Sequence, residues 1–281
     1  MKKNLYMRGL ILNNLNFNRN LVLQYKSNSQ AIRVLTESWL SDNMYCPCCG
    51  NVVLKKFENN KPVADFYCEK CEEQFELKNQ SAVKAGLNFK LKSSGKKIEN
   101  KIVDGAYATA IDRVNSKTNP DLFVLRYGDY KVKDLVVVPK YFFTPDIIEK
   151  RKPLSETARR AGWIGSNILY GKIPLQGKIK IVTDGEIVSS DVVLTEYQQA
   201  SRLYVDNVEK RGWLFDVLNC VNDIPDDIFS LKDIYVFEDA LKNMHPQNNN
   251  VKEKIRQQLQ LLRDREIIEF IDNRGHYRKI K

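Results

Sequence analysis

The chain has 281 residues, 43% of them hydrophobic and 28% charged, with a formal net charge of +10. This length favours two domains with a sizeable core, and the excess of Lys and Arg favours a polyanionic partner such as nucleic acid. The alternative is a soluble globular protein that is basic but has no such partner. No apolar run approaches the roughly 18 residues of a membrane span, and Arg8 interrupts the short apolar stretch near the N-terminus. We therefore expect a cytoplasmic protein.

Helices and strands are predicted in alternation along the first part of the chain. Apolar residues recur at helical spacing over residues 27–40 and 104–114, and Asp104 is the expected cap of the second helix. Strand-like runs occupy residues 52–57, 63–67, 74–77, 122–127, 135–138 and 178–182. This order predicts an α/β fold in which helices flank a mixed sheet.

Four of the six cysteines form two C-x2-C pairs, Cys46 with Cys49 and Cys68 with Cys71. Thiolates at this spacing are typical of a structural zinc site, which leaves no position for a catalytic water. Cys48 is a second candidate within the first pair, but the C-x2-C spacing and the following Gly50 favour Cys49. Buried cysteines without a metal are the alternative, and Cys220 is interpreted as a core residue.

Two carboxylates and an ammonium are expected to converge beside these cysteines. Residues i and i+2 of a strand share a face, so Glu76 and Lys78 point the same way, and Asp65 ends the neighbouring strand. Carboxylates hold Mg²⁺, which together with Lys78 would stabilise the charge of phosphodiester hydrolysis. The pattern D-x10-E-x-K is weak alone, since chance matches are common. Its place in a zinc-tied hairpin between two helices favours a magnesium-dependent phosphodiester hydrolase.

Two further segments are basic. Residues 78–101 contain seven lysines and one acid, Glu99, which we interpret as a basic loop beside the acids. A solvated insertion without contacts is the alternative. Arg159 and Arg160 precede Trp163, and such arginines could bind phosphates while the indole packs on a base. A core tryptophan beside surface arginines is the alternative that the residues alone favour.

The C-terminal residues 207–281 are expected to form a winged helix, a helix-turn-helix variant that binds DNA. Helical patterns at residues 213–221, 231–244 and 251–263 precede two strand-like runs that turn at Gly275. The last of these helices has an apolar stripe, which consists of Val251, Ile255, Leu259 and Leu262. Its opposite face offers groups that can read adenine and guanine edges, namely Asn249, Asn250, Arg256, Gln257 and Gln260. A polar face is also what any surface helix has.

Six segments closely resemble restriction endonucleases of the DpnI type. They are YKSNSQ at 25–30, FENNKPVADFYC at 57–68, ELK at 76–78, DGAYAT at 104–109, ARRAGWIG at 158–165 and KIRQQL at 254–259. The similarity runs from about Leu21 to the C-terminus, and several of the segments are long and therefore specific. The chain departs from that family in a longer basic insertion at 79–101, in the extra Cys48 and in residues 1–20, which have no clear counterpart.

The resemblance implies a PD-(D/E)xK nuclease core with an embedded zinc site at residues 1–206 and a winged helix at residues 207–281. It implies Mg²⁺-dependent cleavage of double-stranded DNA at GATC carrying N6-methyladenine and recognition by both domains, and it does not imply a protein partner. The catalytic residues would be Asp65, Glu76 and Lys78, with the two acids as magnesium ligands. The zinc ligands would be Cys46, Cys49, Cys68 and Cys71. Trp163 would lie near the methyl groups, and the other DNA-binding residues would be Arg159, Arg160, Asn249, Asn250, Arg256 and Gln257.

Two other functions are compatible with these patterns. One is a zinc-containing DNA-binding regulator in which the acidic residues are inert. The other is a repair or recombination nuclease that uses the same core without a methyl preference. The intact set of Asp, Glu and Lys favours a type II, methylation-dependent endonuclease over the regulator.

Overall fold

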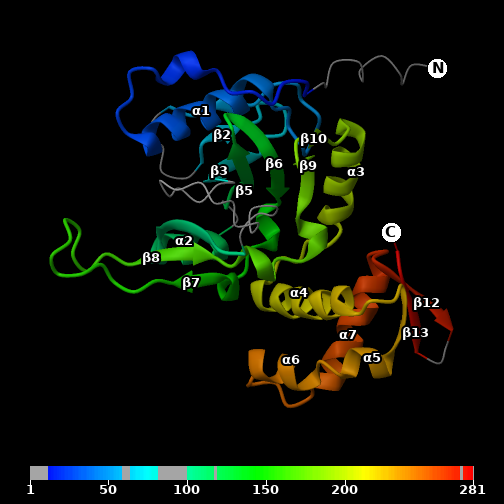
Figure 1. The fold of residues 1–281 in the computed structure, drawn as a ribbon. Coiled ribbons are helices and arrows are strands. Elements are labelled where there is room, and N and C mark those ends of the chain that lie inside the picture. Colours follow the sequence, from blue (N-terminus) through cyan, green and yellow to red (C-terminus); the bar gives the residue numbers. More distant parts are fainter. Residues whose placement is uncertain (1–11, 59–63, 82–99, 117–118, 273–274, 281) are drawn as a thin grey trace, which may run out of the picture. The chain divides into compact units, whose positions relative to one another are not determined.

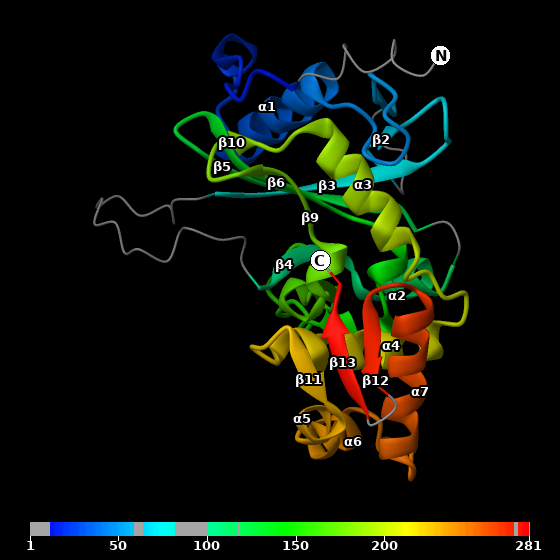
Figure 2. The same ribbon diagram turned by 90° about the vertical axis from the view of Figure 1, so that its right-hand side faces the viewer.

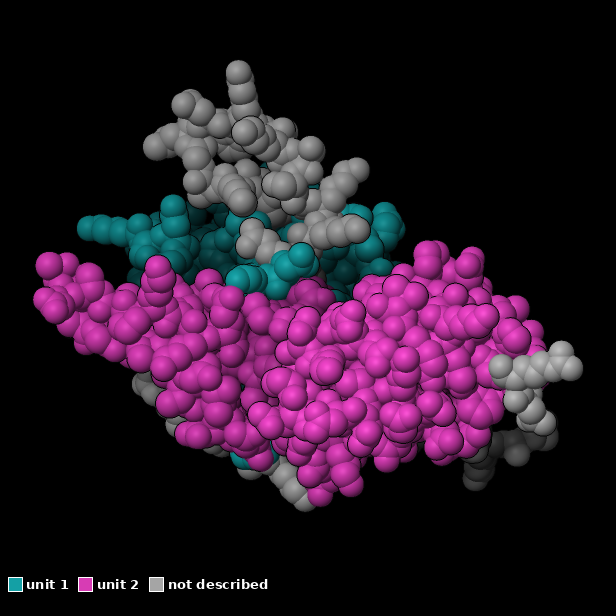
Figure 3. Space-filling model, turned by 90° about the horizontal axis from the view of Figure 1, so that it is seen from below, with its two compact units in different colours: residues 1–102, 116–140, 176–200 teal, residues 103–115, 141–175, 201–281 magenta. Residues whose placement is uncertain are grey.

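The computed structural model describes residues 12–58, 64–81, 100–116, 119–272 and 275–280. The chain divides into two compact units, which Figure 3 shows in teal and magenta. The first unit comprises residues 1–102, 116–140 and 176–200, and the second comprises residues 103–115, 141–175 and 201–281. The chain thus passes between the units several times. A single functional boundary after residue 206 stays a prediction.

A seven-stranded mixed sheet forms the centre of the first unit (Figure 1), in the order β1-β2-β3-β5-β6-β9-β10. The strands are β1 (Lys55–Lys56), β2 (Phe66–Tyr67), β3 (Gln74–Ser81), β5 (Asp121–Gly128), β6 (Lys131–Val138), β9 (Ile179–Thr183) and β10 (Glu186–Ile187). Only β3 and β5 pair in parallel among these neighbours. Consecutive residues of β5 are buried, which is why this strand is apolar throughout rather than alternating. The mixed α/β sheet is confirmed.

Among the described residues, two α-helices belong to the first unit, together with the short 3-10 turn η1 (Arg19–Val22). Helix α1 (Asn28–Asn43) confirms the helix predicted at 27–40 and contacts β3, where the Asn79 amide donates to Thr36 Oγ1 at 3.4 Å. Trp39 is 3% exposed, and its indole N–H donates to the carbonyl of Asn14 at 2.8 Å. Helix α3 (Ser190–Ser201) was not expected, although its buried residues recur at helical spacing.

A buried polar cluster ties α3 to β5. The Tyr197 hydroxyl donates to Asp121 Oδ2 at 2.6 Å, and the backbone N–H of Lys140 donates to Asp121 Oδ1 at 2.8 Å. The Lys140 ammonium pairs in turn with Glu73 at 2.8 Å. Burial, followed by the charge of Glu73, raises the pKa of the Asp121 carboxyl to about 8. The cluster therefore satisfies the hydrogen bonds of a carboxyl that the interior disfavours as an anion.

A three-stranded sheet and helix α2 (Tyr107–Asn115) lie in the second unit. The strand order is β4-β8-β7, with β4 (Ile102–Ala106), β8 (Gly165–Ile168) and β7 (Ile148–Lys150). Asp104, the expected helix cap, lies within β4 instead. The helix begins later than predicted because residues 102–106 pair with β8, and Tyr107 N–H donates to the carbonyl of Ile164. The short 3-10 turns nearby are η2 (Lys140–Phe142), η3 (Pro145–Ile147), η4 (Tyr170–Lys172) and η5 (Leu175–Gly177).

The C-terminal residues form a helical domain with a β-wing (Figure 2). Its helices are α4 (Val208–Asp223), α5 (Leu231–Tyr235), α6 (Glu238–Met244) and α7 (Val251–Asp264). Its sheet has the order β11-β13-β12, with β11 (Ile228–Ser230), β12 (Ile268–Asp272) and β13 (His276–Lys279). The helix predicted at 231–244 is in fact two helices, α5 and α6, and the strand β11 was missed. Gly275 has φ +85° beside the wing turn, as a turn glycine should, whereas residues 273–274 lie outside the described residues.

The apolar stripe predicted for α7 is buried against the rest of this domain. Val251 is 4% exposed, and the other three members of the stripe are fully buried. Across the described ranges, no helix has the length and apolar character needed to cross a membrane.

Candidate active site and metal centre

The two cysteine pairs form knuckles with the same backbone construction. In each knuckle the residue after the second cysteine donates its N–H to the carbonyl of the first, Gly50 to Cys46 and Glu72 to Cys68, both at 2.9 Å. These residues have φ +72° and +61°, in the left-handed region that turns the chain back. The C-x2-C spacing thus folds into two matching turns whose thiols face one another.

The four sulfur atoms have the geometry of a tetrahedral zinc site. The Sγ atoms of Cys46, Cys49, Cys68 and Cys71 lie within 4.8 Å of one another. Both cross-pairs, Cys46 with Cys71 and Cys49 with Cys68, are 3.6 Å apart. Zinc–sulfur bonds of about 2.3 Å imply sulfur–sulfur edges of about 3.8 Å in a regular tetrahedron. The cluster could therefore hold zinc, with Cys49 rather than Cys48 completing the first knuckle.

Asp65 lies directly before β2, the strand between β1 and β3. Its backbone N–H donates to the carbonyl of Phe75, and its carbonyl accepts from the N–H of Phe57, both at 2.9 Å. The side-chain oxygen Oδ2 accepts from the N–H of Leu77 at 2.8 Å. Three hydrogen bonds to neighbouring segments thus hold both the backbone and the carboxylate of Asp65. The adjoining residues Pro62 and Val63 lie outside the described residues.

Glu76 and Lys78 project from the same face of β3. The strand runs continuously from Gln74 to Ser81, so alternation places Phe75, Leu77 and Asn79 on the opposite face. Lys78 Nζ is 2.7 Å from Glu76 Oε1, and the two side chains are 21% and 23% exposed. Both groups are therefore partly accessible, which a group that acts on a polymer substrate requires.

Burial raises the pKa of the Asp65 carboxyl above its ordinary value. The hydrogen bond from Leu77 opposes this rise, the negative charge of Glu37 adds to it, and the positive charges of Lys78 and Arg33 oppose it. The net effect disfavours the ionised form of Asp65, and a cation bound at this carboxyl would oppose the rise as the charges of Lys78 and Arg33 do.

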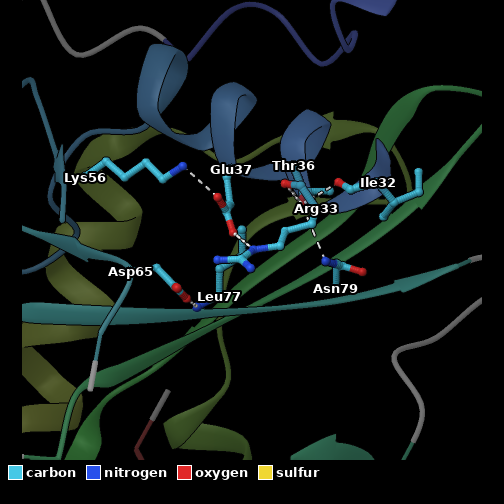
Figure 4. A network of polar contacts seen from close by, with 8 residues as sticks. All are labelled: Ile32, Arg33, Thr36, Glu37, Lys56, Asp65, Leu77 and Asn79. Carbon is cyan, nitrogen blue, oxygen red and sulfur yellow. Dashed lines mark hydrogen bonds and ion pairs between the residues drawn. The ribbon is translucent and has the colours of Figure 1, made fainter. Parts of the chain in front are cut away.

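Glu37 is a functional candidate that the sequence patterns did not indicate. Figure 4 shows it on α1, above Asp65 and Leu77, with ion pairs to Arg33 and Lys56 at 2.6 and 2.7 Å. Glu37 is 7% exposed, so its carboxylate is buried. It lies between the two cations and close enough to Asp65 for its charge to affect that carboxyl. Its neighbours Thr36 and Leu35 on α1 are also buried, which the sequence pattern alone does not show.

Trp163 and the two arginines lie in the second unit, on the loop that joins β7 to β8. Arg159 and Arg160 are exposed, and the Arg160 guanidinium lies 4.5 Å from the centre of the Trp163 ring. Trp163 is only half-buried, so it is not a core tryptophan. The arrangement presents two cations and an aromatic ring on one exposed loop.

The polar face of α7 is exposed in the same unit. Arg256 and Gln257 of α7 are exposed, and so are Asn249 and Asn250, which directly precede the helix rather than lie on it. Lys254 donates to Gln257 Oε1 at 2.9 Å, and Arg256 contacts Glu253 at 3.3 Å. Such surface contacts exchange readily for contacts with a ligand, because each is worth well under about 1 kcal/mol. Most of the basic insertion, residues 82–99, lies outside the described residues.

An α/β core with a cluster of four cysteines, followed by a helix-turn-helix domain, defines a DNA-binding protein. Residues 13–205 match the model of the DpnI family, described as the Dam-replacing family, and residues 209–279 match the Dam-replacing HTH domain. The chain belongs to the DpnI, or Dam-replacing, family of methylation-dependent restriction enzymes. The resemblance seen in the sequence is thereby confirmed.

Proposed function

We propose that this protein is a type II endonuclease that cleaves double-stranded DNA at GATC sites containing N6-methyladenine, by Mg²⁺-dependent hydrolysis. The observation that carries the proposal is the position of Asp65, Glu76 and Lys78 on the hairpin that bears Cys68 and Cys71 of the four-cysteine cluster, in a chain of this family. An intact set of acids and lysine at this point favours a nuclease over a regulator with an inert core.

Asp65 and Glu76 are the residues that would hold Mg²⁺, since carboxylate oxygens are its preferred protein ligands. When bound, the metal would supply a more acidic water and charge stabilisation at the phosphate. The N–H of Leu77 orients the Asp65 carboxylate. Lys78, held 2.7 Å from Glu76, would donate hydrogen bonds to the attacking water and to a non-bridging phosphate oxygen. The water oxygen would bond to phosphorus as the water loses a proton, one phosphorus–oxygen bond of the backbone would break, and the leaving oxygen would take up a proton to become a hydroxyl group.

Recognition of the methylated site is assigned to two places. One is the loop with Arg159, Arg160 and Trp163, where the arginines would bind phosphates and the indole would pack on a methyl group. The other is α7, the recognition helix of residues 207–281, with Arg256 and Gln257 on its exposed face and Asn249 and Asn250 just before its first residue. An N6-methyl group adds little apolar surface, so one pocket discriminates by only about 1–3 kcal/mol. With two independent pockets, the two modest preferences for methylated over unmethylated DNA would multiply.

Plasmid cleavage tests this function. The same plasmid is prepared from a host that methylates adenine in GATC and from a host that lacks this methylation, then digested with Mg²⁺ or with a chelator. We expect cleavage of the methylated plasmid alone, and only with Mg²⁺. Equal cleavage of both plasmids would indicate a nuclease without methyl preference, and cleavage of neither would indicate a DNA-binding regulator.

A further inference from the structure

The indole of Trp163 lies directly against Gly165, where there is no room for a side chain. A Cβ atom added at Gly165 would be 2.8 Å from both Cζ3 and Cη2 of the indole, and 3.4 Å from a guanidinium nitrogen of Arg151. Carbon atoms in good contact are about 3.5–4.0 Å apart. The outer edge of the ring therefore occupies the volume that any other residue at position 165 would need.

The backbone around this contact is held on both sides. Strand β8 lies between β4 and β7, and the N–H of Arg151 donates to the carbonyl of Gly165 at 3.0 Å. The N–H of Leu154 donates to the carbonyl of Trp163 at 2.9 Å, and the N–H of Gly162 donates to the carbonyl of Leu154 at 3.1 Å. A new methyl group at position 165 would thus displace the indole, which is half-exposed, more readily than the strand.

Gly165 does not need to be glycine for its backbone. Its φ lies outside the left-handed region, unlike that of Gly162, which is +76°. Alanine at position 165 would therefore cost no backbone strain. Glycine at this position leaves room for the edge of the indole. The Arg160 guanidinium lies 4.5 Å from the centre of the same ring.

We propose that Gly165 is a positioning residue for methyl-dependent cleavage: its missing side chain sets the place of the Trp163 indole, and with it the preference for methylated DNA. This inference rests on the proposed function, because it takes Trp163 as the group that meets the methyl. It adds a residue that contacts the indole and acts through it.

Gly105 provides a matched control within the same sheet. It lies on β4, next to β8, and its carbonyl accepts from Ser166 Oγ at 3.1 Å. A Cβ atom added at Gly105 meets nothing within 4 Å, and its φ is also outside the left-handed region. Gly105→Ala therefore makes the same chemical change in the same sheet without touching the indole.

The experiment compares the parent, Gly165→Ala and Gly105→Ala in the full-length protein with Mg²⁺. The preference is the ratio of kcat/KM for a methylated GATC duplex to that for the unmethylated duplex. We expect Gly165→Ala to lower this ratio by about tenfold or more, within the range that one methyl pocket provides. We expect Gly105→Ala to keep the ratio of the parent.

A double-mutant cycle with Trp163→Phe tests whether the effect passes through the indole. Phenylalanine lacks the outer ring atoms that contact Gly165, so Gly165→Ala should change the ratio by less than about twofold in that background. This pair also remains informative if Gly165→Ala is unstable by itself. An equal loss of preference in both backgrounds would overturn the inference.

The position of the ring is read independently by fluorine NMR of protein labelled with fluorotryptophan. The chain has three tryptophans, and Trp163→Phe identifies the resonance of Trp163. Gly165→Ala should shift that resonance, and Gly105→Ala should not. If the resonance moves and the preference for methylated DNA stays, the inference is wrong while the proposed function stands. If the parent itself shows no preference, the proposed function fails, and the inference fails with it.

Discussion

Among single residues, Asp65 is the most firmly held group of the proposed active site. Its Oδ2 accepts from the N–H of Leu77, and its backbone is bonded to Phe75 and Phe57. A change from carboxylate to amide can retain the bond from Leu77, since an amide oxygen also accepts. Asp65→Asn therefore removes the charge with little disturbance of the hairpin.

We expect Asp65→Asn to lower the cleavage rate by at least about a hundredfold, because a carboxylate metal ligand and its charge are lost. Binding of the methylated duplex in the absence of Mg²⁺ should stay near that of the parent. Glu69→Gln is the control, an acid-to-amide change on the same hairpin at an exposed residue that pairs with Lys55. Near-native cleavage by Asp65→Asn would contradict the assignment of Asp65 as a metal ligand.

Asp121 predicts a specific dependence of stability on pH. Its pKa is raised from 3.8 to about 8, so the folded state binds the proton more tightly than the unfolded state does. Its contribution to the free energy of unfolding is therefore full below pH 3.8 and is lost as the pH rises through 8. Asp121→Asn removes this titration while it retains an oxygen that can accept from Lys140 N–H.

We expect the stability of the parent relative to Asp121→Asn to fall by about 2 kcal/mol between pH 6 and pH 8, as measured by urea unfolding of both proteins. Comparing the two proteins cancels the titration of groups that they share. A difference that stays constant over this range, or that grows with pH, would contradict the raised pKa of Asp121.

Some residues of the candidate sites could be predicted from the sequence, and others could not. The spacing of the cysteines and the i, i+2 alternation of Glu76 and Lys78 are local patterns, which is why they were found. Glu37 was not found, because its burial depends on cations from α1 and β1 that meet only in the folded chain. Gly165 was not found either, since the volume beside it is defined by the fold of the loop from 151 to 164.

At the scale of elements, the four-cysteine cluster shares backbone with the hairpin that carries the proposed catalytic residues. Strands β2 and β3 flank the second knuckle; Asp65 directly precedes β2, and Glu76 directly follows the residues of β3 that pair with β2. Structural zinc can contribute on the order of 10 kcal/mol to the folding of a small unit. Loss of the metal should therefore disorganise the acids as well as the knuckles.

We expect Cys71→Ser to lose zinc and cleavage together, as measured by metal analysis of the purified protein and by the plasmid assay. Cys48→Ser is the matched control, since Cys48 lies in the first knuckle but outside the group of four sulfurs. It should keep both zinc and cleavage. Purified, active parent protein without zinc would refute this account of the cluster.

Helix α7 leads to a prediction about specificity. Arg256 is exposed and makes one contact of 3.3 Å with Glu253, on the side opposite the buried stripe. We expect Arg256→Ala to weaken binding of the GATC duplex by about 1–3 kcal/mol relative to an unrelated duplex at the same salt concentration, without a change in thermal unfolding. Lys242→Ala, at an exposed residue of α6, is the control. An equal loss for both duplexes would indicate a phosphate contact only.

Helices and strands with long periodic patterns were predicted well. Elements that depend on pairing with a strand from a distant part of the chain were not. The stripe of α7 defined that helix to within one residue, and α1 and β5 were also expected. Asp104 was misassigned to a helix cap because β4 pairs with β8, which comes from a segment far along the chain. The division of 231–244 into α5 and α6 likewise breaks a continuous helical pattern.

For the whole molecule, the groups proposed for cleavage and those proposed for recognition of methylated DNA lie in different units. The acids, Lys78 and the four-cysteine cluster belong to the first unit, whereas the Trp163 loop and α7 belong to the second. The chain passes between the units several times, and the functional boundary expected after residue 206 stays a prediction. Hydrophobic periodicity indicates which residues are buried, but it does not indicate which segments share a core.

The central claim is that cleavage depends on the methyl groups of GATC. Its most direct measurement is kcat/KM with Mg²⁺ for three otherwise identical duplexes that carry the methyl group on both strands, on one strand or on neither. Two methyl pockets that each contribute about 1–3 kcal/mol predict a combined preference of about a hundredfold or more for the fully methylated duplex over the unmethylated one. Equal values of kcat/KM for the three duplexes would contradict the account.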